Sequence, residues 1–150
     1  MKMKILIATD GSKYSKAAVE ECCRMILNPE RDEVQVVSVY ENAYPITAEP
    51  FAMSQEYYEK LDETVRKIAA GYVEEVQKTI SEKFPKAKLS TEILHGAPDQ
   101  QIIERAKEWN ADLIVVGSHG RGFWGRLLGS VSDGVVHHAP CSVLVVRKEV

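Results

Sequence analysis

A glycine-rich segment between residues 115 and 132 carries the residues best suited to bind an anion. The apolar run from Asp112 to Val116 stops at Gly117, and the segment from Gly117 to Ser132 contains five glycines and two arginines. A glycine-rich turn from a strand into a helix lets backbone N–H groups converge, and a helix N-terminus adds about half a positive charge. Because Arg121 and Arg126 add permanent cations, the pattern predicts a site for a phosphate-bearing ligand.

A second polar segment follows the first apolar run of the chain. Residues Lys4 to Thr9 read KILIAT, which is typical of a strand buried on both faces, and Asp10-Gly11-Ser12 comes directly after it. In open parallel sheets, ligands bind outside the carboxyl ends of strands where the winding direction reverses. If the strands that end at Thr9 and Val116 are neighbours, Asp10 and the glycine loop face one crevice.

The whole chain alternates between strand and helix patterns. Apolar runs predict five strands: Lys4–Thr9, Glu33–Tyr40, Lys88–Leu94, Asp112–Val116 and Ser142–Val146. The third alternates polar and apolar residues, as an edge strand does. Because short crossovers through helices make neighbouring strands parallel, the predicted fold is α/β, a five-stranded parallel sheet sandwiched by helices, Rossmann-like or flavodoxin-like.

Four helices are expected between these strands. Ser12 and Ser54 can cap the first two, Pro98 starts the third and Ser130 the fourth. The apolar side of the first is expected to include Met25, and that of the second Ile68. Gly71 lies in the middle of the second helix, so a kink or break is expected there. Residues 41–53 contain two prolines and no clear period, which indicates an irregular connection or a flap over one edge of the sheet.

The composition predicts a single domain over residues 1–150. A hydrophobic content of 45% is enough for a sizeable core, and the net charge of −3 gives no reason to expect nucleic acid or a membrane surface as a partner. The first apolar run is too short for a signal peptide or a membrane span. The three cysteines are not spaced as a disulfide framework or zinc site. We therefore expect a cytoplasmic protein with reduced cysteines and no metal site of its own.

Several segments resemble the universal stress protein family. They are KILIATDGS at the start, VVSVYE, HGAP, DLIVVGSHGRG, and LLGSVSDGVVHHAPCSVLVV near the end. Nucleotide-binding members of that family carry G-x-x-G, nine residues, and then Gly followed by Ser or Thr. Here Gly117-Ser118-His119-Gly120 and Gly129-Ser130 are separated by eight residues, one fewer than in the family pattern.

The resemblance implies an adenine nucleotide alpha hydrolase-like fold and a site for ATP or AMP, which Mg²⁺ can accompany. It places Thr9, Asp10 and Val39 around the adenine and ribose. Around the phosphates it places Gly117, Gly120, Gly129, Ser130, Val131 and Ser132, and Arg121 lies in the same loop. It also implies a homodimer through the last strand, Val143 to Val146, whose apolar edge would otherwise be exposed.

Plainer interpretations remain open for several of these residues. Gly117 and Gly120 could only turn a tight corner, Asp10 could only cap a helix, and Arg121 could be a solvated charge. His119 is expected to have no role in ligand binding. Phe123 and Trp124 could anchor the loop or line a ligand or partner surface.

The enzyme motifs that would signal catalysis are missing from the sequence. The glycine loop has neither the lysine of a Walker motif nor the G-x-S-x-G of a nucleophile elbow. We therefore predict a universal stress protein that binds ATP as a regulatory homodimer and is not an enzyme. The alternative is a protein-interaction dimer that does not bind nucleotide, which the eight-residue spacing favours. A weaker third hypothesis is slow ATP hydrolysis or self-phosphorylation at Ser130 or Ser132.

Overall fold

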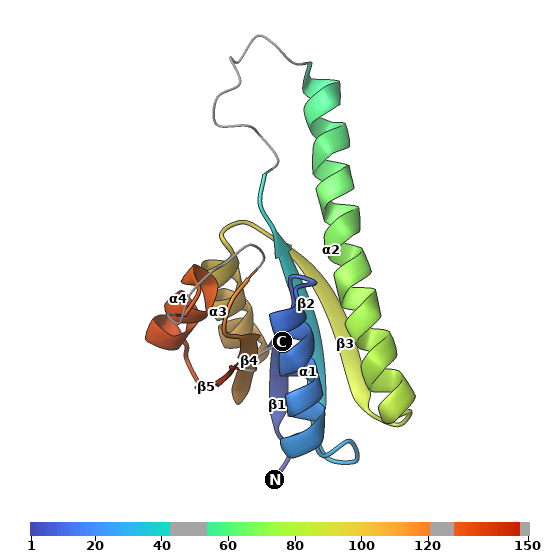
Figure 1. Ribbon diagram of the computed structural model, residues 1–150, viewed down its shortest axis with the longest axis vertical. Helices are drawn as coiled ribbons and strands as arrows, with labels where there is room; N and C mark the ends of the chain where they lie inside the picture. The colour runs from blue at the N-terminus through green and yellow to red at the C-terminus, as the bar shows by residue number, and fades with distance from the viewer. Residues whose placement is uncertain (43–53, 121–127, 148–150) are drawn as a thin grey trace.

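A computed structural model describes residues 1–42, 54–120 and 128–147 of the chain. Its five parallel strands form a sheet in the order β3-β2-β1-β4-β5 (Figure 1). The strands are β1 Lys4–Ala8, β2 Glu33–Tyr40, β3 Lys88–His95, β4 Leu113–Gly117 and β5 Ser142–Val146. The predicted α/β fold is confirmed, with the expected edge strand β3 at one side of the sheet. Most of the connection expected over residues 41–53 lies outside the described residues, as do Phe123 and Trp124.

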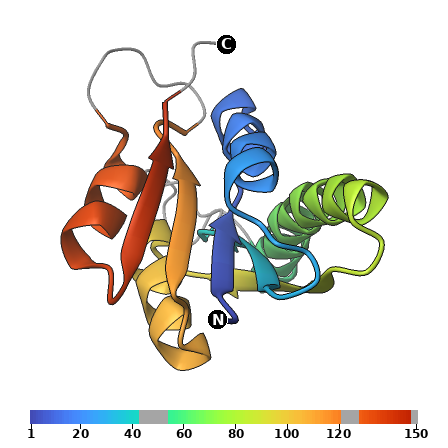
Figure 2. The ribbon, with the colours of Figure 1, turned by 90° about the horizontal axis from the view of Figure 1, so that it is seen from below.

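The helices cover both faces of the sheet (Figure 2). They are α1 Lys13–Met25, α2 Gln55–Lys83, α3 Pro98–Trp109 and α4 Ser130–His138. Helices α1 and α2 pack on one face, and α3 and α4 pack on the other. Ser12 and Ser54 cap α1 and α2 as predicted, each accepting a hydrogen bond from the backbone N–H three residues later.

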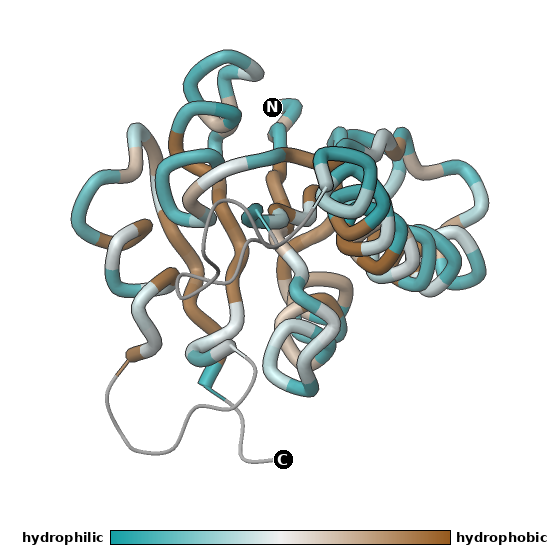
Figure 3. Tube along the Cα trace, turned by 90° about the horizontal axis from the view of Figure 1, so that it is seen from above, coloured by the Kyte–Doolittle hydropathy of each residue, from teal (hydrophilic) through white to brown (hydrophobic). Residues whose placement is uncertain are grey.

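The central strands are apolar on both faces because helices lie on both sides of them. Ile5, Leu6 and Ile7 of β1 are all 0% exposed, and the strands form the hydrophobic middle of the molecule in Figure 3. Such continuous apolar runs stabilise only a strand with two covered faces. Strand β3 alternates instead, because one of its edges and part of its surface face solvent.

The order of the strands decides where a ligand can bind. Strand β1 pairs with β2 on one side and with β4 on the other, with Ile7 opposite Val115. The chain winds outward from β1 to β3 and then crosses to β4, so the direction of winding reverses between β1 and β4. The condition set by the sequence is therefore met: the segments after Thr9 and Val116 leave neighbouring strands at the same edge.

Two expected apolar contacts are wrong. Met25 is 63% exposed and Ile68 is 50% exposed. Met25 is the last residue of α1, beside the edge strand β5, where the described chain has nothing to cover it. Ile68 lies about 100° around the axis of α2 from its buried neighbour Ala69, so its side chain does not face the sheet. At about 1.5 Å per residue, the 29 residues of α2 are longer than the strands they cover.

Gly71 does not interrupt α2, which runs as one helix from Gln55 to Lys83. A Cβ atom placed on Gly71 would have nothing within 4 Å. We expect Gly71→Ala to raise the free energy of unfolding by about 0.5–1 kcal/mol, because alanine loses less backbone entropy in a helix. Urea denaturation followed by circular dichroism measures the change, and a destabilised variant would contradict this account of α2.

Candidate functional site

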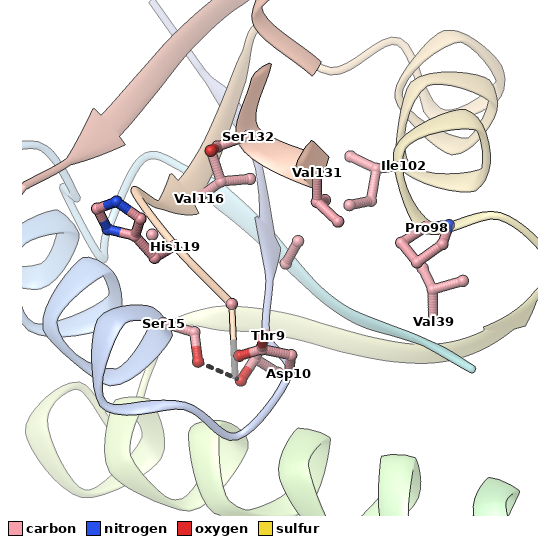
Figure 4. Close-up of a pocket in the computed structure, with 13 residues that line it drawn as sticks. Thr9, Asp10, Ser15, Val39, Pro98, Ile102, Val116, His119, Val131 and Ser132 are labelled. Carbon is pink, nitrogen blue, oxygen red and sulfur yellow. Dashed lines mark hydrogen bonds between the residues drawn. The ribbon is translucent and has the colours of Figure 1, made fainter. Parts of the chain in front are cut away.

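A pocket of about 160 Å³ lies at the carboxyl ends of β1 and β4 (Figure 4). It occupies the point where the winding of the sheet reverses, the position expected for a ligand in this class of fold. The lining residues come from every layer around that point: Ala8, Thr9, Asp10, Ser15, Val39, Pro98, Ile102, Val116, Gly117, His119, Gly120, Val131 and Ser132.

Most of the residues predicted from sequence lie together in this pocket. Its lining includes Thr9, Asp10, Val39, Gly117, Gly120, Val131 and Ser132. Gly129 and Ser130 lie just outside the lining, at the start of α4, with Gly129 buried and Ser130 exposed. Arg121 lies outside the described residues.

Six lining residues were not predicted: Ala8, Ser15, Pro98, Ile102, Val116 and His119. Ala8 and Val116 directly precede predicted segments of the site, so their proximity could have been read from the sequence. Pro98 and Ile102 belong to the first five residues of α3, which the HGAP segment brings to the same edge of the sheet. Only the packing of α1 against the loops shows that Ser15 and His119 belong to the lining.

The pocket has an apolar side and a polar side. Val39, Pro98, Ile102 and Val131 lie together on one side in Figure 4, and Thr9, Asp10, Ser15 and His119 lie on the other. An apolar wall suits a flat ring, and hydroxyl and carboxylate groups suit a polar ring with hydroxyls. The arrangement therefore matches a ligand with one apolar and one polar end.

Asp10 shapes the turn between β1 and α1. Its Oδ1 accepts a hydrogen bond of 2.9 Å from the backbone N–H of Ser12. The cap of α1 is the hydroxyl of Ser12, which accepts from the N–H of Ser15, so Asp10 is not the capping residue. Oδ2 of Asp10 lies 3.0 Å from where a Cβ of Gly120 would be. The first loop and the glycine loop are thus in direct contact, as a shared crevice requires.

Ser118 fastens the start of α4 to the end of β4. Its carbonyl oxygen accepts from the backbone N–H of Gly129 at 2.8 Å and from the hydroxyl of Ser132 at 2.9 Å. The Ser132 hydroxyl is also 3.0 Å from the carbonyl oxygen of Gly129. Because carbonyl groups inside the protein accept its proton, Ser132 can offer a ligand its backbone N–H but not its hydroxyl hydrogen.

The first turn of α4 borders the pocket through Val131 and Ser132. Its cap residue Gly129 has no side chain to accept from the N–H groups of that turn. The first N–H groups of a helix have no partner within the helix and carry a partial positive charge. This turn therefore presents donors suited to an anion at the border of the pocket.

Comparison with known proteins identifies the family. Residues 1–147 match the Universal stress protein family. The chain belongs to the universal stress protein family. It is 32% identical over 148 residues to a universal stress protein of Methanocaldococcus jannaschii, covering 97% of this chain and 82% of the relative. The family resemblance seen in the sequence is confirmed.

Solved structures share the fold of this universal stress protein. Universal stress protein UspA from Lactobacillus plantarum has a TM-score of 0.76 at 25% identity, over 97% of each chain. A universal stress protein family member from Arabidopsis thaliana with AMP bound has a TM-score of 0.71 at 20% identity, covering 98% of this chain and 92% of that chain. The second comparison concerns the fold alone.

The two ends of the short glycine segment lie next to each other in this universal stress protein. A Cβ placed on Gly129 would lie 3.2 Å from the Cα of His119 and 3.5 Å from the backbone nitrogen of Gly120. Gly120 and Gly129 are therefore close in space, although eight residues separate them in the sequence. The loss of one residue relative to the family pattern does not separate the helix start from the end of β4.

Neither a candidate metal centre nor a candidate membrane-spanning helix is present in the part of the chain that the structure describes. No group of three or more His, Cys, Asp or Glu side chains there could hold a metal ion. Among the same residues, no helix combines the length and the apolar character needed to cross a bilayer.

Proposed function

We propose that this universal stress protein binds an adenine nucleotide, ATP or AMP, as a regulatory ligand in the pocket between β1 and β4. The observation that carries the proposal is the division of that pocket: an apolar wall lies at one side, a carboxylate and a glycine loop lie at the other, and a helix N-terminus borders the pocket. The Arabidopsis protein of the same fold holds AMP, which supports an adenine nucleotide as the class of ligand.

Each part of the nucleotide has a matching part of the pocket. The base packs against Val39 and Ile102, and the ribose hydroxyls donate to Asp10. The phosphates accept from backbone N–H groups of the loop after Gly117 and of the first turn of α4, with Arg121 as a further cation. Mg²⁺ bound to ATP neutralises phosphate charge, and Asp10 can accept from a water molecule of its hydration shell.

The proposed role is binding without catalysis. Asp10 and His119 are the titratable side chains in the described lining. Asp10 holds the turn before α1 through Ser12, and His119 is hydrogen-bonded to its neighbour Ser118. Neither arrangement places a base next to an attacking water, so the proposal assigns no catalytic residue.

The proposal includes a cytoplasmic homodimer through β5. This strand lies at the edge of the sheet, and Val143, Leu144 and Val145 are only partly buried. Pairing β5 with β5 of a second copy would give hydrogen-bond partners to the backbone groups at this edge of the sheet and cover these side chains. The three cysteines are free thiols, which fits a reducing compartment.

Calorimetry on protein freed of carried-over nucleotide tests the binding. We expect ATP with Mg²⁺ or AMP to bind at millimolar concentration or below. Val39→Trp, which fills the apolar side of the pocket, should weaken binding at least about 100-fold, because the base loses its space. The matched control is Val136→Trp on the exposed face of α4, which should bind like the wild type. Absence of heat with both nucleotides would overturn the proposal.

Native mass spectrometry separates the proposal from its alternative. A dimer that retains an adenine nucleotide as purified supports the proposal. A dimer that neither retains nor binds nucleotide supports the protein-interaction function, and inserting a ninth residue after Gly120 should then create affinity for ATP. A mass increase of one phosphate group after incubation with ATP would instead support self-phosphorylation.

A further inference from the structure

His119 lies between the two glycines of the loop that follows β4, and its side chain contacts two different elements. Its Nδ1 is 2.8 Å from the hydroxyl oxygen of Ser118. Its ring packs against the ring of Tyr14 in the first turn of α1, with centroids 5.1 Å apart and planes tilted by 58°. In Figure 4 the ring extends away from the apolar side of the pocket, so His119 lines the polar side.

The partners of His119 are themselves held in place. Ser118 is 2% exposed, and its backbone N–H donates to the carbonyl of Val146 while its carbonyl accepts from Gly129 and Ser132. Tyr14 belongs to the turn of α1 whose backbone lies directly against Gly117. A side chain that bridges two fixed elements restricts the backbone to which it is attached.

We propose that His119 positions the phosphate-binding loop and thereby sets the preference of the pocket for a nucleotide over its nucleoside. The inference rests on the proposed function and concerns the same site. The backbone N–H groups of His119 and Gly120 can bind a phosphate only when their directions are fixed, because the ordering of a free loop would cost binding energy. Adenosine lacks the phosphate and is indifferent to this loop.

A comparison of the affinities for AMP and adenosine tests the inference. We expect the wild type to bind AMP more tightly than adenosine. His119→Ala should weaken AMP about tenfold, the loss of one hydrogen bond to a charged group, while adenosine affinity changes less than about twofold. His119→Asn, which can keep a polar contact with Ser118, should recover part of the loss. The matched control is His137→Ala on the exposed face of α4, which should leave both affinities unchanged.

A double-mutant cycle tests the contact between the two rings. Tyr14→Ala should cause part of the loss in AMP affinity seen with His119→Ala, and the double variant should be no worse than His119→Ala, because His119→Ala already removes the contact between the two rings. Tyr14→Phe keeps the ring and should bind like the wild type. Equal losses for AMP and adenosine, or additive effects of the two alanines, would overturn the positioning role. Failure of the wild type to bind either ligand would instead overturn the proposed function.

Discussion

Gly117→Ala is expected to destabilise the protein by about 1–3 kcal/mol and to abolish measurable nucleotide binding. A Cβ on this residue would lie 2.7 Å from the carbonyl carbon of Tyr14, 2.8 Å from its oxygen and 2.9 Å from the backbone nitrogen of Ser15. These atoms are the backbone of α1 and cannot turn aside as a side chain can. The methyl group must push α1 away from β4, which costs packing energy of this size.

The same displacement reaches the pocket. Ser15 lines it, and its hydroxyl lies 3.2 Å from that of Thr9. Moving the first turn of α1 therefore moves the polar side of the site together with the end of β1. Thermal or urea unfolding gives the stability change, and calorimetry with AMP gives the loss of binding.

Gly71→Ala is the matched control for this substitution. Both variants add one methyl group to a glycine, but at Gly71 the space is empty. The two changes should have opposite signs: destabilising at Gly117 and stabilising at Gly71. If Gly117→Ala were as stable as the wild type and bound AMP normally, the close approach of α1 to β4 would not be a requirement of the site.

The order of elements and the position of the pocket were accessible from the sequence. Strands β2 and β5 begin and end at the predicted residues, because each is an apolar run bounded by residues that disfavour a strand. From the sequence, the adjacency of β1 and β4 could only be stated as a condition. The strand order of the structure confirms that they are neighbours. A switch point between them then brings Asp10 and Gly117 to one edge without any knowledge of side chains.

Other features depend on how each helix packs on the sheet. Apolar spacing identifies the inner face of a helix only approximately: Ile68 belongs to the apolar spacing of α2 and is 50% exposed, whereas its neighbour Ala69 is 3% exposed. Spacing also cannot place the His119 ring against Tyr14, because these residues are far apart in sequence. The sequence suggested that Gly117 faces a phosphate, whereas the structure shows that it also faces the backbone of α1.

The contacts of Asp32, a buried carboxylate, could not be predicted from the sequence either. In the sequence it stands between Arg31 and Glu33, as in an ordinary surface turn. In the structure its side chain is 0% exposed and accepts hydrogen bonds from the backbone N–H groups of Met3 and Asn28 and from the guanidinium of Arg31. The carboxylate joins the chain before β1 to the turn before β2, and no short-range pattern predicts that contact.

Asp32→Ala is expected to lower the free energy of unfolding by about 2–4 kcal/mol, because its buried N–H donors lose their acceptor. Burial raises the pKa of this carboxyl, but the hydrogen bonds from Arg31, Asn28 and Met3 outweigh burial and leave the pKa below its ordinary value. A lowered pKa in the folded state means that the carboxylate stabilises the fold above the pKa of the unfolded chain. That contribution is lost as the pH falls through the lower, folded-state pKa.

Urea denaturation between pH 7 and pH 3 measures both effects. The stability difference between the wild type and Asp32→Asn should be largest near neutral pH. It should begin to shrink below about pH 4, where the carboxyl of the unfolded chain takes up a proton, and shrink further as the pH falls toward the lower, folded-state pKa. Glu33→Gln is the matched control, since Glu33 pairs with Lys2 at the surface and such pairs contribute at most about 1 kcal/mol. A difference that stays constant across this range would mean that the hydrogen bonds to Asp32 do not depend on its charge.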